Sequence, residues 1–500
     1  MSIISLSYLL FLCAVIIVYY IVPKKFQWIV LLVSSYAFYC TGGPGAVGFV
    51  LGTTLVTFGS GILMDKNKAK YKSKKEAKAH NKKILVCTIV LIFGILFLMK
   101  YMKMFIPSPV FMIVLPMGIS FYMFQSIGYC IDVYRNTIQT ERNLTRYALF
   151  ISFFPLAIQG PISRYGQLSE QLTGEHKFEF DNFKSGAQLM IWGFFKKMVI
   201  ADRLSVIVST VFDDYTAYDG TQTAVAIACY ALQIYIDFSG GIDIVRGAAK
   251  CLGIDLIENF ERPYLAPNIA EHWRRWHIAL TSWMRDYVFY SLALSKTSSK
   301  IGKWSRNHLK GHIGKQMPSY LPTYVTFFLI GIWHGAGWGF IVFGFYNATL
   351  IVLSMMLEPV WDKLNKTFRV KTECIPWRIW QIVRTFIVMA IGRSMTRALS
   401  VGAGLSMIGK CVHIFDFHDF VHRMLSLGLD FEDCLILALA FIVFVCAGII
   451  QERGVNIREV LATKNIAIRW AVWIIGILAI IIFGMYGPGF DASAFIYRGF

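Results

Sequence analysis

The stretch Thr326-Phe327-Phe328-Leu329-Ile330-Gly331-Ile332-Trp333-His334-Gly335 places a histidine directly behind an apolar run, and a second apolar run from Trp338 to Leu353 follows it. Apolar runs of about 20 residues have the length of a helix that crosses a bilayer. Because an ionisable side chain at membrane depth is costly, it marks a substrate path or a reacting centre by default. We therefore interpret His334 as a functional residue, the alternative being a structural ring that caps a helix break.

The composition supports a membrane protein. Of the 500 residues, 56% are hydrophobic and 16% are charged, whereas soluble domains carry about 25% charged residues. The apolar runs are continuous, which is typical of helices and not of the alternating strands of a membrane barrel. We expect an all-α polytopic membrane protein with roughly 11–13 transmembrane helices plus re-entrant or interfacial helices. The predicted helices lie near 3–22, 26–40, 46–64, 84–100, 105–134, 146–162, 186–211, 222–238, 278–295, 320–333, 336–357, 376–398, 432–450 and 467–487.

Lysines are clustered in one short segment of this chain, whose formal net charge is +19. Nine lysines crowd the loop 65–83, namely Lys66, Lys68, Lys70, Lys72, Lys74, Lys75, Lys78, Lys82 and Lys83. The positive-inside rule predicts that this loop is cytoplasmic, where it also meets anionic membrane lipid. Counting helices back from the loop places the N-terminus outside. Nucleic-acid binding would need interleaved aromatic residues or a known module, and the sequence has neither.

Helix-breaking residues interrupt the predicted membrane segments between about residues 115 and 357. Three breaks are predicted, around Pro116-Met117-Gly118, Pro155 to Pro161, and Gln233 to Gly241. Free backbone groups at membrane depth persist only where they are buried in protein or line a wet cavity, so we expect a funnel or tunnel there. We predict a single membrane domain, 1–500, whose parts are N-terminal helices (1–114), a catalytic core (115–357), C-terminal helices (358–494) and an aromatic tail (495–500). The polar segment 296–319 is predicted to be a loop.

Further site candidates come from the stretch Trp273-Arg274-Arg275-Trp276-His277. Its residues fit an interfacial helix with tryptophans at the headgroup level, and they fit equally well a site at which Arg274 and Arg275 receive an anionic donor. Asp237 and Gln159 accompany predicted breaks, where a role as cap or dipole partner is favoured over direct catalysis. The pairs His308/His312 and His418/His422 have a helical metal-ligand spacing, but no carboxylate or cysteine completes a set, so no metal site is expected.

These motifs, taken together, resemble the bacterial branch of the membrane-bound O-acyltransferase family, which includes alginate O-acetyltransferase-like and teichoic acid D-alanyltransferase-like proteins. The resemblance covers most of the chain and rests on Gln159-Gly160-Pro161-Ile162-Ser163-Arg164-Tyr165, Tyr235-Ile236-Asp237-Phe238-Ser239-Gly240, the stretch from Trp273 to Tyr287, and Gly331-Ile332-Trp333-His334-Gly335. It implies a multi-helix fold with a thin partition between an outer funnel and a cytoplasmic opening. It also implies that His334 is the catalytic histidine and His277 a second site histidine.

The C-terminal stretch Phe495-Ile496-Tyr497-Arg498-Gly499-Phe500 is similar to the aromatic tail of these bacterial systems. The resemblance implies that Tyr497 accepts and passes on the acyl group, and the alternative is an aromatic anchor at the membrane surface. Trp333, Asp237, Gln159, Arg274 and Arg275 are the candidates for the tunnel or for donor binding.

The resemblance implies transfer of an acyl group, acetyl first and D-alanyl second, from a cytoplasmic acyl-CoA or acyl-carrier-protein thioester to an extracytoplasmic polysaccharide or cell-wall polymer. His334 would act as the base, and His277 or a main-chain donor would stabilise the oxyanion.

No bound cofactor is expected. The expected partner is an extracytoplasmic transferase resembling SGNH hydrolases, and the expected location is the bacterial cytoplasmic (inner) membrane. A transporter or flippase for lipid-linked saccharides is the alternative, although transporters commonly show matched breaks in two halves.

Overall fold

The computed structural model describes residues 1–105, 118–309, 311–413 and 418–486. These residues are mostly helical, and the only β-pairing among them is an isolated antiparallel bridge between Phe260 and Trp276. The prediction of an all-α protein is therefore confirmed. The described residues form two compact units, the first containing Met1–Phe194, Gly240–Glu258 and Tyr486, and the second containing Phe195–Ser239 and Asn259–Met485.

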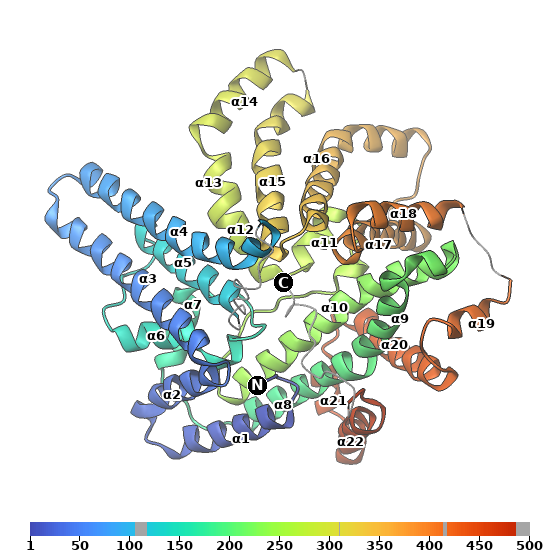
Figure 1. Ribbon diagram of the computed structural model, residues 1–500, viewed down its shortest axis with the longest axis horizontal. Coiled ribbons are helices and arrows are strands. Elements are labelled where there is room, and N and C mark those ends of the chain that lie inside the picture. The colour runs from blue at the N-terminus through green and yellow to red at the C-terminus, as the bar shows by residue number, and fades with distance from the viewer. Residues whose placement is uncertain (106–117, 310, 414–417, 487–500) are drawn as a thin grey trace. The chain divides into compact units, whose positions relative to one another are not determined.

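The first unit begins with a series of apolar helices. They are α1 (Leu6–Ile21), α2 (Gln27–Cys40), α3 (Pro44–Lys70), α4 (Lys74–Phe105), α5 (Ile119–Arg135), α6 (Leu144–Ser152), α7 (Tyr165–Thr173) and α8 (Phe180–Phe194). Figure 1 shows α3 and α4 as a long antiparallel hairpin. The tip of this hairpin is braced by a hydrogen bond from Asn67 to Asn81 and by the stacked rings of Tyr71 and His80, 4.5 Å apart.

All nine lysines of the segment 65–83 are exposed at this tip, so the segment predicted as a loop is a helical hairpin with a short turn.

We expect the turn to face the cytoplasm because lysine-rich connections are retained on that side. Trypsin should then cut at Lys70 or Lys72 in inverted membrane vesicles and leave right-side-out vesicles intact, as followed with an N-terminal epitope. Detergent-solubilised protein, which exposes both sides, is the control. Cleavage confined to right-side-out vesicles would show that the turn faces the outside, opposite to the prediction.

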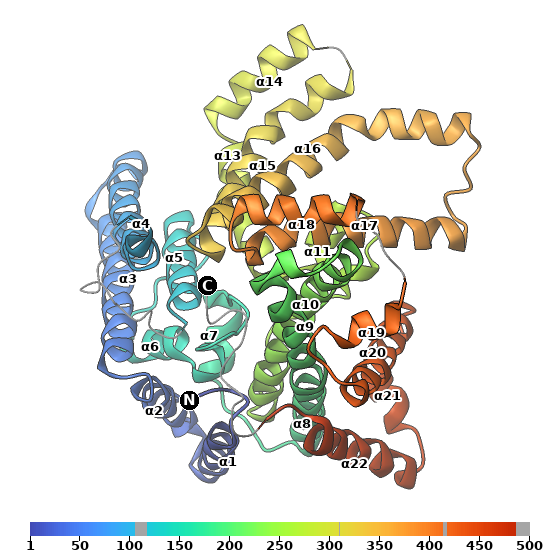
Figure 2. The same ribbon diagram turned by 45° about the vertical axis from the view of Figure 1, so that its right-hand side comes forward.

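The second unit contains the helices that follow. They are α9 (Asp202–Asp213), the first part of α10 (Gly220–Cys251), α11 (Ile269–Arg275), α12 (Ile278–Met284), α13 (Tyr290–Ala293), α14 (Lys296–His308), α15 (His312–His334), α16 (Trp338–Thr367), α17 (Ile375–Arg397), α18 (Val401–His413), α19 (Phe420–Leu425), α20 (Phe431–Glu452), α21 (Ile457–Ala462) and α22 (Ile466–Phe483). Figure 2 shows α14, α15 and α16 as neighbouring rods. Two π-helical segments, Phe195–Ala201 and Arg285–Phe289, belong to this unit as well, and such segments are frequent at functional sites.

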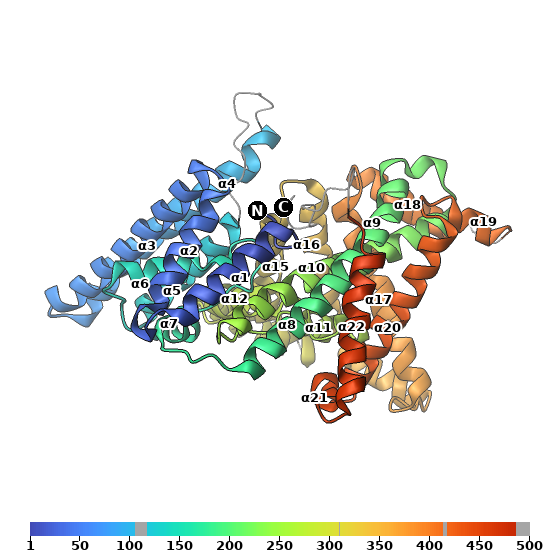
Figure 3. The ribbon, with the colours of Figure 1, turned by 90° about the horizontal axis from the view of Figure 1, so that it is seen from below.

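A buried ion network holds the π-helix Phe195–Ala201 in place. The Lys197 ammonium lies 2.7 Å from a carboxylate oxygen of Asp202 and 2.7 Å from one of Asp237, and all three side chains are at most 5% exposed. The preceding Lys196 donates a hydrogen bond to Ser239. Helices α9, α20 and α22 pack around this π-helix (Figure 3). Asp237 of α10 is thereby linked by charge to the π-helix and, through Lys197, to Asp202 of α9. It directly precedes Phe238, which lies against the site described below.

Two sequence predictions are wrong in detail. The polar segment 296–319 is not a loop: it forms α14 and the start of α15, and α14 begins where the Ser295 side chain caps the backbone N–H of Ser298. The predicted break between Gln233 and Gly241 does not form either, because α10 runs through it without interruption. Gly193 of α8 instead allows close packing against this part of α10, since a Cβ atom on Gly193 would lie 2.6 Å from the Gly240 carbonyl oxygen.

The predicted break between Pro155 and Pro161 is confirmed, because α6 ends at Ser152 and only a short 3₁₀ turn, Phe154–Leu156, follows before α7. The predicted helix 105–134 is described only from Ile119, where α5 begins. Residues 106–117, including Pro116 and Met117, lie outside the described residues. Within the described residues, six helices are long and apolar enough to cross a membrane, namely α3, α4, α10, α16, α20 and α22. The chain is thus a multi-pass membrane protein by composition, and the total of 11–13 spans stays a prediction.

Candidate active site

His334 is the last residue of α15 and is 8% exposed. The local sequence lets α15 and α16 approach very closely around it. A Cβ atom on Gly331 would lie 2.5 Å from the Phe340 carbonyl oxygen, and one on Gly344 would lie 2.5 Å from the Phe327 carbonyl oxygen. Such spacing excludes any larger residue, as expected where small residues set the distance between membrane helices. The His334 ring packs edge-on at 6.2 Å from Phe343 of α16.

His277 lies in the turn between α11 and α12 and is 1% exposed. Its backbone is left-handed, with φ 44° and ψ 53°, a region that residues other than glycine seldom occupy. Edge-on contacts surround its ring, with Phe238 of α10 at 4.8 Å and Trp333 of α15 at 5.6 Å. Because the ring is buried, its pKa is lowered from 6.5 to about 3, so the neutral form prevails near pH 7.

Trp333 brings the two histidines into one site. Its indole ring lies 5.6 Å from the ring of His277 and 4.8 Å from the ring of His334, measured between centroids. The three residues belong to the same compact unit. Two buried imidazoles separated by one aromatic ring form a low-dielectric centre in which proton transfer and charge stabilisation are strong.

The segment before His277 is held by a buried arginine that the sequence analysis missed. Arg393 of α17 is 3% exposed, and its guanidinium stacks 3.5 Å above the ring of Trp276. It also contacts Nε2 of His272 at 3.1 Å, while Nδ1 of that ring lies 2.9 Å from the Pro263 carbonyl oxygen. Nothing in the sequence near Arg393 points to this role, because its partners are about 120 residues upstream.

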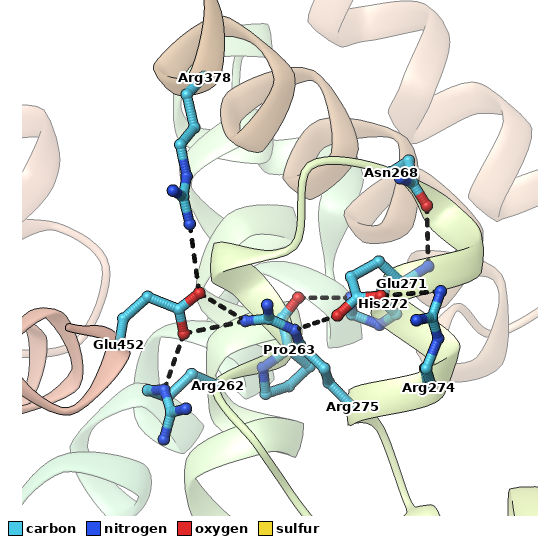
Figure 4. A network of polar contacts seen from close by, with 9 residues as sticks. All are labelled: Arg262, Pro263, Asn268, Glu271, His272, Arg274, Arg275, Arg378 and Glu452. Carbon is cyan, nitrogen blue, oxygen red and sulfur yellow. Dashed lines mark hydrogen bonds and ion pairs between the residues drawn. The ribbon is translucent and has the colours of Figure 1, made fainter. Parts of the chain in front are cut away.

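Arg274 and Arg275, predicted as a pair of donor-binding charges, have different surroundings (Figure 4). Arg275 is largely buried and binds Glu271 at 2.8 Å and both carboxylate oxygens of Glu452, the last residue of α20, at 3.0 Å. Arg262 and Arg378 also contact Glu452, at 2.9 and 3.4 Å. Arg275 is therefore a structural link.

Arg274 has a side chain that is 70% exposed and pairs only with Glu271 among the ion pairs formed by the described residues, at 2.9 Å. An exposed pair of this kind is weak and exchanges partners readily. Of the two predicted donor-binding arginines, only Arg274 is therefore accessible to an anionic ligand.

The remaining predicted site residues are placed as follows. Asp237 is bonded to Lys197, as described above, which agrees with the structural role favoured from the sequence. Gln159 lies in the first unit, is 1% exposed, and neither polar atom of its side chain has a hydrogen-bond partner among the described residues. Tyr497 lies outside the described residues. The rings of His308 and His312 contact the carbonyl oxygens of Trp304 and Met355.

The chain matches the membrane-bound O-acyltransferase family over residues 50–400. It belongs to that family. It is similar to a probable alginate O-acetylase AlgI of Azotobacter vinelandii, with 32% identity over 451 residues that cover 88% of this chain and 83% of the relative. It is also similar to the peptidoglycan O-acetyltransferase of Helicobacter pylori, with 28% identity over 62% of this chain and 61% of the relative. The teichoic acid D-alanyltransferase of Bacillus subtilis is 26% identical over 54% of this chain and 65% of the relative.

Family membership establishes the class of reaction. The chain is an O-acyltransferase of the membrane-bound family, as the resemblance implied. The matched region, residues 50–400, contains both site histidines and their aromatic neighbours Phe238 and Trp333. The transporter alternative is accordingly set aside.

Proposed function

We propose that this O-acyltransferase moves an acetyl group from a cytoplasmic thioester across the bacterial cytoplasmic membrane for O-acetylation of an extracytoplasmic polysaccharide. The observation that carries the proposal is the buried centre in which Trp333 lies against both His277 and His334. The relatives named as O-acetylase and O-acetyltransferase favour acetyl over D-alanyl. The nine exposed lysines at the α3–α4 turn support a cytoplasmic side from which a donor can approach.

In the proposed reaction His334 acts as the general base. The acceptor hydroxyl oxygen attacks the carbonyl carbon of the thioester while the hydroxyl proton passes to the imidazole. The carbon–sulfur bond then breaks, an ester remains on the acceptor, and the departing thiolate takes the proton back from the imidazole. His334 suits this step because imidazole is the side chain whose ordinary pKa lies near neutrality.

The donor is proposed to be acyl-CoA or an acyl-carrier protein, both of which carry phosphate groups. Arg274 is the docking charge that we favour, because its side chain is exposed and free to exchange its partner Glu271 for a phosphate oxygen. Arg275 is excluded from this role by its bonds to Glu271 and Glu452. On the other side of the membrane, a separate extracytoplasmic transferase of the SGNH-hydrolase type would carry the acyl group to the polymer.

Tyr497 is proposed as the first acceptor. Mass spectrometry of the C-terminal peptide from native membranes should then find an ester on Tyr497 in the wild-type protein. The ester should be absent from His334→Ala, because the phenol needs a base to lose its proton as it attacks. The added mass identifies the acyl group. A Tyr497→Phe protein should still be present in the membrane but should not acylate the polymer.

Two outcomes would contradict the relay. One is a tail that stays unmodified, under conditions that trap esters, in wild-type membranes that consume thioester at a normal rate. The other is normal polymer acylation by Tyr497→Phe. Either result would mean that the acyl group passes directly from the thioester to the final acceptor, with the enzyme class unchanged.

A further inference from the structure

Asn259, in the segment between α10 and α11, contacts three consecutive residues of the His277 turn. Its backbone carbonyl accepts the N–H of Ile278 at 3.0 Å, and its side-chain Oδ1 accepts the N–H of Ala279 at 3.0 Å. The same Oδ1 lies 3.2 Å from Nδ1 of His277. Asn259 is 0% exposed, so no solvent competes for these bonds. Together they hold the left-handed backbone of His277 in place, a conformation that otherwise costs energy.

These contacts fix which atom of the amide faces the imidazole. A main-chain N–H can bond only to an acceptor, so the atom that faces Ala279 is Oδ1 and the amide cannot be turned around. Oδ1 has no proton to donate, and two acceptors at 3.2 Å would repel each other. The proton of the hydrogen bond is therefore on Nδ1 of His277. A neutral imidazole carries one ring proton, so Nε2 is the unprotonated nitrogen.

The surroundings of His277 keep the ring neutral. The rings of Phe238, Phe260 and Trp333 lie 4.8, 6.4 and 5.6 Å from it. Burial among these apolar side chains disfavours the charged form of the ring. The carboxylate next in sequence to Phe238 is Asp237, which is bonded to Lys197. The other titratable ring nearby, His334, lies against Trp333.

We propose that Asn259 is a positioning residue that fixes His277 in the Nδ1–H tautomer, so that Nε2 serves the acyl transfer as a hydrogen-bond acceptor. The inference rests on the proposed function, in which His277 lines the reacting centre. It assigns to His277 the orientation of the attacking hydroxyl: Nε2 accepts the hydroxyl hydrogen bond in the bound state, before the proton passes to His334. A neutral ring in this tautomer has no Nε2–H to offer an oxyanion. Of the two oxyanion donors considered from the sequence, the main-chain group is therefore favoured.

Two substitutions separate the hydrogen bond from the shape of the side chain. Asn259→Leu keeps the volume and removes the acceptor. Asn259→Asp keeps an acceptor oxygen and adds a charge, which raises the pKa of His277 and protonates Nε2 at low pH. The matched control is Asn347→Leu, since Asn347 is also 0% exposed and its side chain also accepts a hydrogen bond, from Trp273, while donating another to the Phe343 carbonyl.

The first measurement is spectroscopic and does not need activity. Nitrogen-15 NMR of histidine-labelled protein in lipid distinguishes protonated from unprotonated ring nitrogens, and His277→Gln assigns the signals. We expect a protonated Nδ1 and an unprotonated Nε2 in the wild-type and Asn347→Leu proteins, and loss of this pattern in Asn259→Leu. A protonated Nε2 in the neutral wild-type ring, or an unchanged pattern in Asn259→Leu, would overturn the inference.

The second measurement is the pH dependence of thioester consumption. Asn259→Leu should be slower than wild type by about 10- to 100-fold at every pH, the range found when a residue that orients a metal-bound histidine is replaced. Asn259→Asp should be slow at low pH and recover as the pH rises through the raised pKa of His277. A rate of Asn259→Asp that does not recover at high pH, or that recovers only at low pH, would contradict the acceptor role. If the wild-type protein consumes no thioester while the NMR pattern is as expected, the proposed function fails and the tautomer assignment stands.

Discussion

Replacing His334 by alanine is expected to slow acyl transfer by about 10²- to 10⁴-fold, the range that a general base contributes. His334 is only 8% exposed, and alanine has no group that can accept the hydroxyl proton in its place. Alanine is a good helix former and smaller than histidine, so the close packing of α15 on α16 is retained. Thioester consumption by membranes with matched protein content measures the effect.

His312→Ala is the matched control, because His312 is the first residue of the same helix. Its ring contacts the Met355 carbonyl oxygen and the Glu358 carboxylate at a partly exposed position. We expect this variant to retain wild-type rates. Substantial ester formation by His334→Ala would show that another group removes the proton, and the first residue to test would then be His277.

Lys197→Met is expected to lower the free energy of unfolding of the second unit by about 3–5 kcal/mol, the cost of removing one partner from a buried ion pair. The substitution leaves Asp202 and Asp237 near each other without the ammonium that both contact at 2.7 Å. We expect less protein in the membrane and a lower midpoint of thermal unfolding in detergent.

Removing all three charges at once tests whether the effect is electrostatic. Adding Asp202→Asn and Asp237→Asn to Lys197→Met should recover much of the lost stability, because a buried ion network can be replaced by neutral residues at little net cost. Lys184→Met is the surface control, since its partner Asp181 is 88% exposed and such pairs contribute about 0–1 kcal/mol. Equal losses in the single and triple variants would attribute the effect to packing.

The fold was predictable wherever hydrophobicity alone decides the structure. Helices α1, α17, α20 and α22 lie within a few residues of their predicted ranges, because long apolar runs have one stable conformation in a bilayer. One error arose where a polar segment forms an amphipathic helix. Helix α14 was missed although Ser295 is a good N-cap residue. The glycines at 240 and 241 were interpreted as breaking a helix, but α10 runs through them and Gly193 of α8 packs against the Gly240 carbonyl oxygen.

The site was predictable to the extent that a polar residue in an apolar run is informative by itself. His334 and His277 met that condition, and the structure brings both against Trp333. Asn259 and Arg393 did not meet it. Asn259 contacts the turn that follows it by about twenty residues, and Arg393 acts on Trp276 from another helix. Contacts of this kind depend on the tertiary fold, which periodicity and composition do not encode.

The Glu452 network has a practical consequence for experiments on this chain. Glu452 ends α20, outside the region matched to the family, yet it pairs with Arg262, which precedes α11, and with Arg275, the last residue of α11. Arg275 is two residues before His277. A reporter fused upstream of residue 452 would therefore produce a protein whose arginines repel one another beside the His277 turn. Sidedness and activity should be measured on full-length protein with internal tags, because truncated fusions would report the behaviour of a damaged molecule.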